Sequence, residues 1–134
     1  MTSLVVDASV ALKWCVDEPG SAEAVAVHGR RLLAPDYLLV EVANVLCRKL
    51  RRGEATVPQV RAAMQTLPDA FDLLAPAPEL LTRAVELAVA LQHPVYDCLY
   101  LALAERENAE MVTDDAKLLA KGVAAQVKVV ALRG

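Results

Sequence analysis

The stretch Leu4-Val5-Val6-Asp7-Ala8-Ser9 joins three apolar residues to an acid and two small residues. This order is typical of a buried β-strand that ends in a turn. Comparable short apolar runs recur along the sequence, separated by helical patterns. Because buried strands that alternate with helices form parallel sheets covered on both faces, we expect an α/β fold, a three-layer α/β/α sandwich. Its functional groups should lie beyond the C-terminal ends of the strands.

Cap and turn residues divide the remaining chain into elements. Further strands are expected at 32–35, 71–75, 111–113 and 127–132, and helices at 10–15, 22–32, 37–52, 57–67, 79–91, 97–105 and briefly after 115. The residues expected to begin helices are Ser9, Ser21, Asp36, Thr56, Asp97 and Asp115. No linker or repeat interrupts this order, so residues 1–134 are predicted to form a single domain.

The composition is that of a folded globular protein. Hydrophobic residues make up 56% of the chain, which excludes a disordered protein. The longest uncharged run, 87–96, contains Pro94 and is shorter than the ~20 residues of a membrane span. Asp7 interrupts the apolar start, so we expect no signal peptide. The three cysteines lack paired spacing and indicate reduced, buried thiols in a cytoplasmic protein, in preference to a zinc site.

Acidic residues directly follow two predicted strands. Asp7 follows the first strand, and Asp114 and Asp115 follow the strand at 111–113. The C-terminal ends of parallel strands meet at one edge of a sheet, so these acids should lie near one another.

Two further acids, Glu41 and Asp97, lie within apolar helical stretches. A buried carboxylate needs a partner, and carboxylates that converge repel one another unless they share a cation. Oxygen ligands alone favour Mg²⁺ or Mn²⁺. Zinc is disfavoured because His28 and His93 lack the spacing of metal ligands.

Each acid also has a purely structural interpretation. Asp7 is compatible with a turn residue, Asp97 and Asp115 with helix caps, and Glu41 with a solvated helix position. The acids Asp36, Asp69 and Asp72 flank predicted helix or strand starts, and we expect them to be structural.

Four segments, taken together and in order, resemble the motifs of PIN-domain ribonucleases, and specifically of the VapC-type toxins of bacterial toxin–antitoxin pairs. The segments are 4–9 with Asp-x-Ser, 34–44 with a helical Glu, 95–104 with Asp in an apolar helix, and 111–115 with Thr-x-Asp. The resemblance implies Mg²⁺- or Mn²⁺-dependent cleavage of RNA, a homodimer and a small cognate antitoxin.

Matched position by position, the resemblance implies an acidic quartet that binds metal and is catalytic, consisting of Asp7, Glu41, Asp97 and Asp115. Supporting positions are Ser9, Asn44, Thr113 and Asp114, of which Asp114 occupies the variable position of its motif. In this interpretation a metal-activated water attacks the phosphorus. Ser9 is disfavoured as a nucleophile because no His/Asp relay accompanies it.

The RNA must be held by a local basic strip, because the net charge of −3 disfavours a protein that is basic overall. Arg48 and Arg51 lie on the same broad helical face as Glu41, and Lys13 lies one turn after Ser9. These three cations are predicted to contact phosphates; the alternative is a solvated helix end, where cations favour the helix dipole. Few aromatic residues are present, so limited base stacking is expected.

Other interpretations remain open. The same nuclease fold could process RNA without an antitoxin, or the acids could belong to a non-catalytic metal-binding interaction module. A haloacid-dehalogenase-like phosphatase is disfavoured, because Ser9 stands where that family has its second Asp. The apolar face of the helix at 79–91 is expected to pack in the core, with self-association or an antitoxin groove as alternatives.

Overall fold

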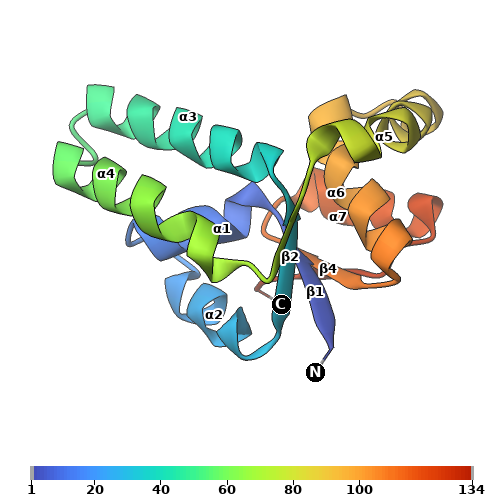
Figure 1. Ribbon diagram of the computed structural model, residues 1–134, viewed down its shortest axis with the longest axis horizontal. Helices are drawn as coiled ribbons and strands as arrows, with labels where there is room; N and C mark the ends of the chain where they lie inside the picture. The colour runs from blue at the N-terminus through green and yellow to red at the C-terminus, as the bar shows by residue number, and fades with distance from the viewer. Residues whose placement is uncertain (1, 134) are drawn as a thin grey trace.

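The computed structural model describes residues 2–133 and contains a five-stranded, all-parallel sheet in the order β3-β2-β1-β4-β5. The strands are β1 (Ser3–Val6), β2 (Arg31–Pro35), β3 (Leu73–Ala75), β4 (Glu110–Thr113) and β5 (Val129–Ala131). The helices are α1 (Ala8–Cys15), α2 (Ser21–Ala26), α3 (Tyr37–Arg51), α4 (Val57–Thr66), α5 (Ala77–Leu91), α6 (Val95–Glu107) and α7 (Ala116–Ala125), with 3-10 turns at Val27–Gly29 and Leu67–Ala70. Figure 1 shows α1–α4 on one side of the sheet and α5–α7 on the other. The predicted α/β/α sandwich is confirmed.

Strand β1 lies at the centre of the sheet and pairs with β2 on one side and β4 on the other. Its residues Leu4, Val5 and Val6 are at most 1% exposed. Helix α6 covers the middle of the sheet, and its stretch from Cys98 to Ala104 is buried throughout. A helix that is apolar on all sides is expected in such a position. The core therefore holds the ends of β1 and β4 and the start of α6 in fixed relation.

The helix expected at 22–32 is present but ends earlier than predicted. The chain forms the short α2 and a 3-10 turn, and it is extended again from Arg31, which pairs with Ser3 of β1. Leu32 and Leu33 are buried within the sheet. Strand pairing in the centre of the protein therefore outweighs the local helical pattern.

Several expected caps are also corrected. Asp7, rather than Ser9, caps α1, and Gly20, with a φ of 93°, precedes α2 in place of Ser21. Asp36 makes no cap bond, and its carboxylate instead accepts a hydrogen bond from the backbone N–H of Ala77 at the start of α5. Helix α6 begins at Val95, two residues before Asp97.

Two predicted caps are confirmed. Thr56 forms a reciprocal capping box with Gln59 at the start of α4, and Asp115 accepts a hydrogen bond from the N–H of Lys117 at the start of α7. Asp72 is structural as expected, because it accepts a hydrogen bond from the N–H of Leu32.

The expectation of three buried cysteines is confirmed only for Cys98, because Cys15 is partly exposed and Cys47 on α3 is exposed. Over residues 2–133 no disulfide forms. In the same range, no single helix has the length and hydropathy of a membrane span, although α5 and α6 together reach them as a pair bent by 115°.

Helix α7 and strand β5 pack at very short range. A Cβ atom placed on Gly122 would lie 2.6 Å from Cγ2 of Val129 and 3.0 Å from the carbonyl oxygen of Val127. Any other residue at position 122 would therefore push β5 away from the helix. The glycine sets the distance between the last helix and the last strand.

Candidate active site

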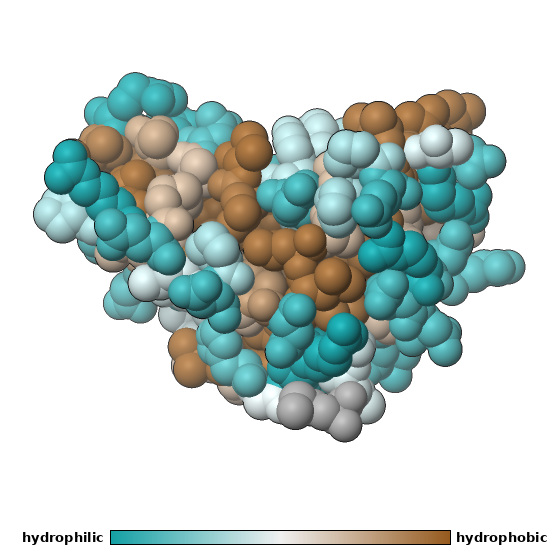
Figure 2. Space-filling model, in the orientation of Figure 1, coloured by the Kyte–Doolittle hydropathy of each residue, from teal (hydrophilic) through white to brown (hydrophobic). Residues whose placement is uncertain are grey.

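A cavity of about 630 Å³ opens beyond the C-terminal ends of β1 and β4, and the four predicted acids line it. Asp7 joins β1 to α1, Glu41 lies in α3, Asp97 lies in the first turn of α6, and Asp115 precedes α7. We call this space the acidic cavity. Figure 2 shows the molecular surface hollowed between the α3 side and the α5–α6 side, with hydrophobic residues along the α3 wall. The topology thus collects carboxylates from four elements.

Asp7 lies deepest among the four acids, at 4% exposure. Its Oδ1 accepts hydrogen bonds from the Ser9 hydroxyl at 2.6 Å and from the N–H of Val10 at 3.3 Å, and its Oδ2 accepts one from the Thr113 hydroxyl at 2.5 Å. Burial, with a smaller contribution from the negative charge of Asp97, raises the pKa of Asp7 to about 6 despite these hydrogen bonds. Asp7 therefore gains from any positive charge placed beside it.

Glu41 receives a hydrogen bond of 2.6 Å from the phenol of Tyr100, which is buried beneath it on α6. Burial raises the pKa of Glu41 to about 7, and the charges of Asp97 and Asp7 add to this effect. The pKa of the Tyr100 phenol lies well above 10, mainly because of its own burial. Tyr100 is therefore a permanent donor that holds the Glu41 carboxylate toward α6.

Asp97 pairs with His93, which precedes α6. The Nε2 atom of His93 lies 2.8 Å from Oδ2 of Asp97, and the His93 side chain is 7% exposed. Burial raises the pKa of Asp97, His93 lowers it, and the charge of Asp115 raises it. The absence of a Lys or Arg beside Asp97 in the sequence is thus explained by a histidine one helical turn away.

The donor set of the acidic cavity fits a hard divalent cation. It offers carboxylate oxygens from four elements. The charge of Asp97 raises the pKa values of Asp7 and Glu41, the charge of Asp7 raises that of Glu41, and the charge of Asp115 raises that of Asp97. A cation would relieve this repulsion. Within residues 2–133, however, no three such side chains are already spaced around a common ion position. Each carboxylate turns instead toward its own donor, so a bound ion would require the side chains to rotate.

The supporting residues fall into two groups. Ser9 and Thr113 hold Asp7 directly, and Asn44 lines the acidic cavity one turn after Glu41. The Thr113 hydroxyl also accepts a hydrogen bond from the N–H of Asp115 at 3.0 Å, which links two of the acids.

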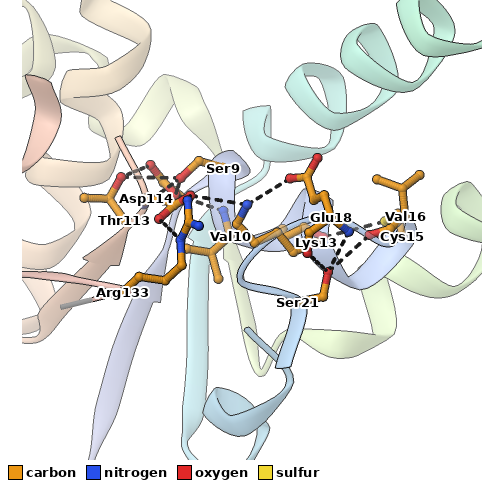
Figure 3. A network of polar contacts seen from close by, with 12 residues as sticks. Ser9, Val10, Lys13, Cys15, Val16, Glu18, Ser21, Thr113, Asp114 and Arg133 are labelled. Atoms are coloured by element: carbon orange, nitrogen blue, oxygen red, sulfur yellow. Dashed lines mark hydrogen bonds and ion pairs between the residues drawn. The ribbon is translucent and has the colours of Figure 1, made fainter. Parts of the chain in front are cut away.

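Asp114 lies outside the cavity lining, in a network with Arg133 and Lys13 (Figure 3). Both cations lower the pKa of Asp114. Its backbone N–H donates a 2.9 Å hydrogen bond to the Ser9 hydroxyl. Asp114 therefore supports Asp7 indirectly, because its backbone N–H holds the Ser9 hydroxyl that donates to Asp7.

The prediction that Lys13 contacts phosphate is wrong. Its side chain is 6% exposed, and its ammonium lies 2.9 Å from Glu18 and 3.2 Å from Asp114 (Figure 3). A buried cation needs such partners, and breaking them would leave uncompensated charge. Lys13 is therefore a structural residue that fastens α1 to the end of β4.

The two predicted arginines differ in position. Arg48 lines the acidic cavity on the α3 side, whereas Arg51 lies on the exposed C-terminal turn of α3, outside the lining. Neither forms an ion pair with a residue in the range 2–133. Among the lysines and arginines of residues 2–133, Arg48 alone lines the acidic cavity.

Sequence reasoning missed the residues that orient the acids. The i,i+4 spacing of His93 and Asp97 is a usable signal for their pairing, but Pro94 between them suggested a loop. All three tyrosines of the chain, Tyr37, Tyr96 and Tyr100, line the acidic cavity. Their clustering depends on α3 and α6 facing each other across the cavity, which no local pattern reveals.

Comparison with known proteins identifies the family of the chain. The family model of the PIN domain matches residues 4–123. Ribonuclease VapC1 of Mycobacterium tuberculosis is 34% identical over 97% of this chain and 99% of its own length. Ribonuclease VapC3 of Pyrobaculum aerophilum is 34% identical over 88% of this chain and 93% of its own length.

Solved structures share the fold. The Pyrobaculum aerophilum protein PAE2754 superposes with a TM-score of 0.72 at 23% identity, covering 98% of this chain and 91% of its own. A toxin–antitoxin complex from Klebsiella pneumoniae has a chain with a TM-score of 0.67 at 16% identity, covering 96% and 97%. From its family model and its curated relatives, the chain belongs to the PIN-domain family, among the VapC-type proteins.

Proposed function

We propose that this protein is a Mg²⁺- or Mn²⁺-dependent endoribonuclease and the toxin of a VapBC-type toxin–antitoxin pair. The observation that carries the proposal is the meeting of Asp7, Glu41, Asp97 and Asp115 in one cavity at the end of the sheet. Relatives named as ribonucleases, at 34% identity over most of the chain, support the choice of RNA as substrate.

The four carboxylates would hold the ion, which when bound would activate a water and neutralise charge on the phosphodiester. The protein's own part is to orient the ligands. Ser9, Thr113 and the N–H of Val10 fix Asp7, the Tyr100 phenol fixes Glu41, and the His93 ring fixes Asp97. Such supporting hydrogen bonds align metal ligands and tune their basicity.

Other residues of the cavity would hold the RNA. Arg48 would contact a phosphate, and the Asn44 amide would donate to a phosphate oxygen or orient Glu41. Ser9 has a supporting role in this proposal, because its hydroxyl donates to Asp7 and accepts from the N–H of Asp114. The proposed attacking group is water.

The test is cleavage of a mixed set of structured and unstructured RNAs by purified protein, with Mg²⁺, with Mn²⁺ and with EDTA. We expect cleavage that EDTA abolishes and that Asp97→Asn lowers by at least about 100-fold, a typical loss when a charge-stabilising group is removed. Asp17→Asn is the matched control, because Asp17 is an exposed acid outside the acidic cavity. Cleavage that persists in EDTA, or that survives in Asp97→Asn, would contradict the proposal.

The proposed partners are a cognate antitoxin and a second copy of the chain. One solved relative is a toxin–antitoxin complex. Helix α5 buries Leu80, Ala84 and Leu87 in the core, as expected, but a second apolar row remains exposed, consisting of Leu81, Val85 and Val89.

Production of the chain alone should arrest growth of a bacterial host, and the Asp97→Asn variant should not. Growth arrest by both forms would show that toxicity does not come from the acidic cavity.

A further inference from the structure

An aromatic pair lies in the acidic cavity beside the proposed metal ligands. The rings of Tyr37 on α3 and Tyr96 on α6 have centroids 6.5 Å apart and planes tilted by 34°. Tyr96 immediately precedes Asp97 in the chain. Both rings line the same cavity as the four acids and Arg48.

The two rings differ in burial in a way that suggests different roles. Tyr37 packs partly against the hydrophobic core, whereas Tyr96 is 45% exposed although it is a large aromatic residue. Val40, one helical turn after Tyr37, lines the same wall and is 58% exposed. The cavity therefore combines the four acids with exposed apolar side chains from both α3 and α6, and the Tyr37 ring lies beside the exposed ring of Tyr96.

We propose that Tyr96, supported by Tyr37, is the stacking surface for an unpaired nucleobase of the RNA next to the cleaved phosphate. The inference rests on the proposed ribonuclease function and adds a base-binding subsite to it. A nucleotide has a charged phosphate and an apolar base, and the cavity offers cation and ion ligands for the first and an open ring for the second. The contiguous Tyr96 and Asp97 bring the two within reach of one nucleotide.

The chemistry favours a single-stranded target at the cleavage point. In a duplex both faces of a base are already stacked, so only a base that has left the helix presents a free face to a tyrosine. Every base has such a face, so the subsite selects for an unpaired nucleotide more than for a particular base. Base stacking thus has a place in this protein despite its few aromatic residues.

The first experiment is a double-mutant cycle between protein and RNA. Cleavage by wild type and by Tyr96→Ala is compared on an RNA that the protein cuts. The comparison is repeated on a series of versions of that RNA, each with a single abasic nucleotide at a different position flanking the cut. We expect Tyr96→Ala to lower kcat/KM by roughly 5- to 150-fold, the range for one base–aromatic stack. At one position the abasic RNA should cost the wild type a similar factor and cost Tyr96→Ala nothing further.

Two variants control this experiment. Tyr96→Phe keeps the ring and should retain activity within about twofold, because stacking needs the π-face and not the hydroxyl. Val123→Ala removes apolar surface from an 88% exposed residue of α7, outside the cavity, and should cleave like wild type. If the abasic and Tyr96→Ala losses simply multiply at every position, the subsite is refuted.

The second experiment measures binding without cleavage, so that failure of the subsite can be told from failure of the ribonuclease. Single-stranded RNA carrying 2-aminopurine at successive positions is titrated with Asp7→Asn in EDTA. At one position we expect the fluorescence to be quenched, with quenching kept in Asp7→Asn/Tyr96→Phe and lost in Asp7→Asn/Tyr96→Ala. Quenching without cleavage by wild type would refute the ribonuclease and keep the base subsite; no Tyr96-dependent quenching at any position would refute the subsite. If Tyr96→Ala instead changes the number of copies per particle in solution, Tyr96 is a contact between copies of the chain.

Discussion

Asp7 combines a structural and a proposed catalytic task in one carboxyl group. It caps α1 through the N–H of Val10, and the hydroxyls of Ser9 and Thr113 hold its two oxygens. Its burial makes the charged form costly, and a bound cation would offset that cost. At the scale of the residue, hydrogen bonds therefore fix the orientation of the Asp7 carboxylate, while burial makes its negative charge unfavourable.

Replacing Asp7 by Asn should stabilise the metal-free protein near pH 7.5. The folded-state pKa of about 6 lies above the ordinary value of 3.8, so between these values the folded protein binds more protons than the unfolded chain. Stability therefore falls as pH rises through this window and stays low above it. Since Asn cannot ionise, the variant should gain up to about 3 kcal/mol at pH 7.5.

The check is urea unfolding of both forms in EDTA at pH 4 and pH 7.5. The gain of Asp7→Asn should disappear at pH 4, where the wild-type carboxyl is protonated. Loss of stability at pH 7.5 would show that the cap and hydroxyl contacts of the carboxylate outweigh its burial.

His93 should affect metal affinity through Asp97. His93→Leu removes the hydrogen bond to Oδ2 of Asp97, and we expect Mn²⁺ binding to weaken by about 10- to 100-fold, as for other groups that orient metal ligands. His93→Gln keeps a donor and should lose less. Calorimetric titration measures both, and equal Mn²⁺ affinity in all three proteins would remove His93 from the site.

At the scale of the element, α3 carries an acid, an amide and a cation along one side. Glu41, Asn44 and Arg48 follow one another at helical spacing and all line the acidic cavity. Helical periodicity alone was enough to predict that grouping. Arg51 continues the series along the sequence but lies outside the cavity lining, where the helix ends.

Arg48→Gln should weaken RNA binding and make it less sensitive to salt. Loss of one phosphate contact lowers the slope of log Kd against log salt by about 1. Arg61→Gln is the control, because Arg61 is an exposed arginine on α4 outside the acidic cavity. A salt slope unchanged in Arg48→Gln, measured by fluorescence anisotropy on uncleaved RNA, would exclude the contact.

Gly122→Ala should destabilise the protein although alanine favours helices. The new Cβ would approach Val129 to 2.6 Å, so β5 must shift, and overpacking of this kind costs about 1–3 kcal/mol. Gly29→Ala is the matched control, because its Cβ would meet no atom within 4 Å. Thermal unfolding of both variants distinguishes the packing effect from a general effect of losing glycine.

The sequence predicted elements best where local and global preferences agree. Thr56 and Asp115 cap helices as expected, because the segment that follows each of them is helical in the fold as well as by its local pattern. The helix expected at 22–32 ends early because pairing of Arg31 with Ser3 draws its last residues into the sheet. Lys13 was misassigned because its partner Asp114 is distant in the chain, and such a contact leaves no periodic signal.

At the scale of the whole molecule, the site is a product of topology. The rule that ligands bind beyond the ends of parallel strands placed Asp7 and Asp115 in advance. The orienting shell was beyond prediction, because Tyr100 and Glu41 meet only when the fold brings α6 and α3 to the same cavity. The acids could therefore be found from sequence, whereas the groups that hold them required the fold.

Divalent metal should stabilise the whole protein, and more strongly at pH 7.5 than at pH 5.5. Carboxyls with pKa values of about 6 and 7 are partly protonated at the lower pH, so protons compete with the ion. At about 100 times its Kd, Mn²⁺ should add about 3 kcal/mol, on the order of 10 °C in Tm. Asp97→Asn should reduce the shift; a shift independent of pH and of Asp97 would place the ion elsewhere.

The hydrogen bond between Thr113 and Asp7 spans 106 positions of the sequence. Strand β1 also needs β4 as its neighbour on one side, so a chain still being synthesised lacks half of the support for its first carboxylate. Domains assemble their distant contacts last. Asp7 is made near the start of the described residues, but the acidic cavity stays incomplete until β4, Thr113 and Asp115 have also left the ribosome and folded against β1.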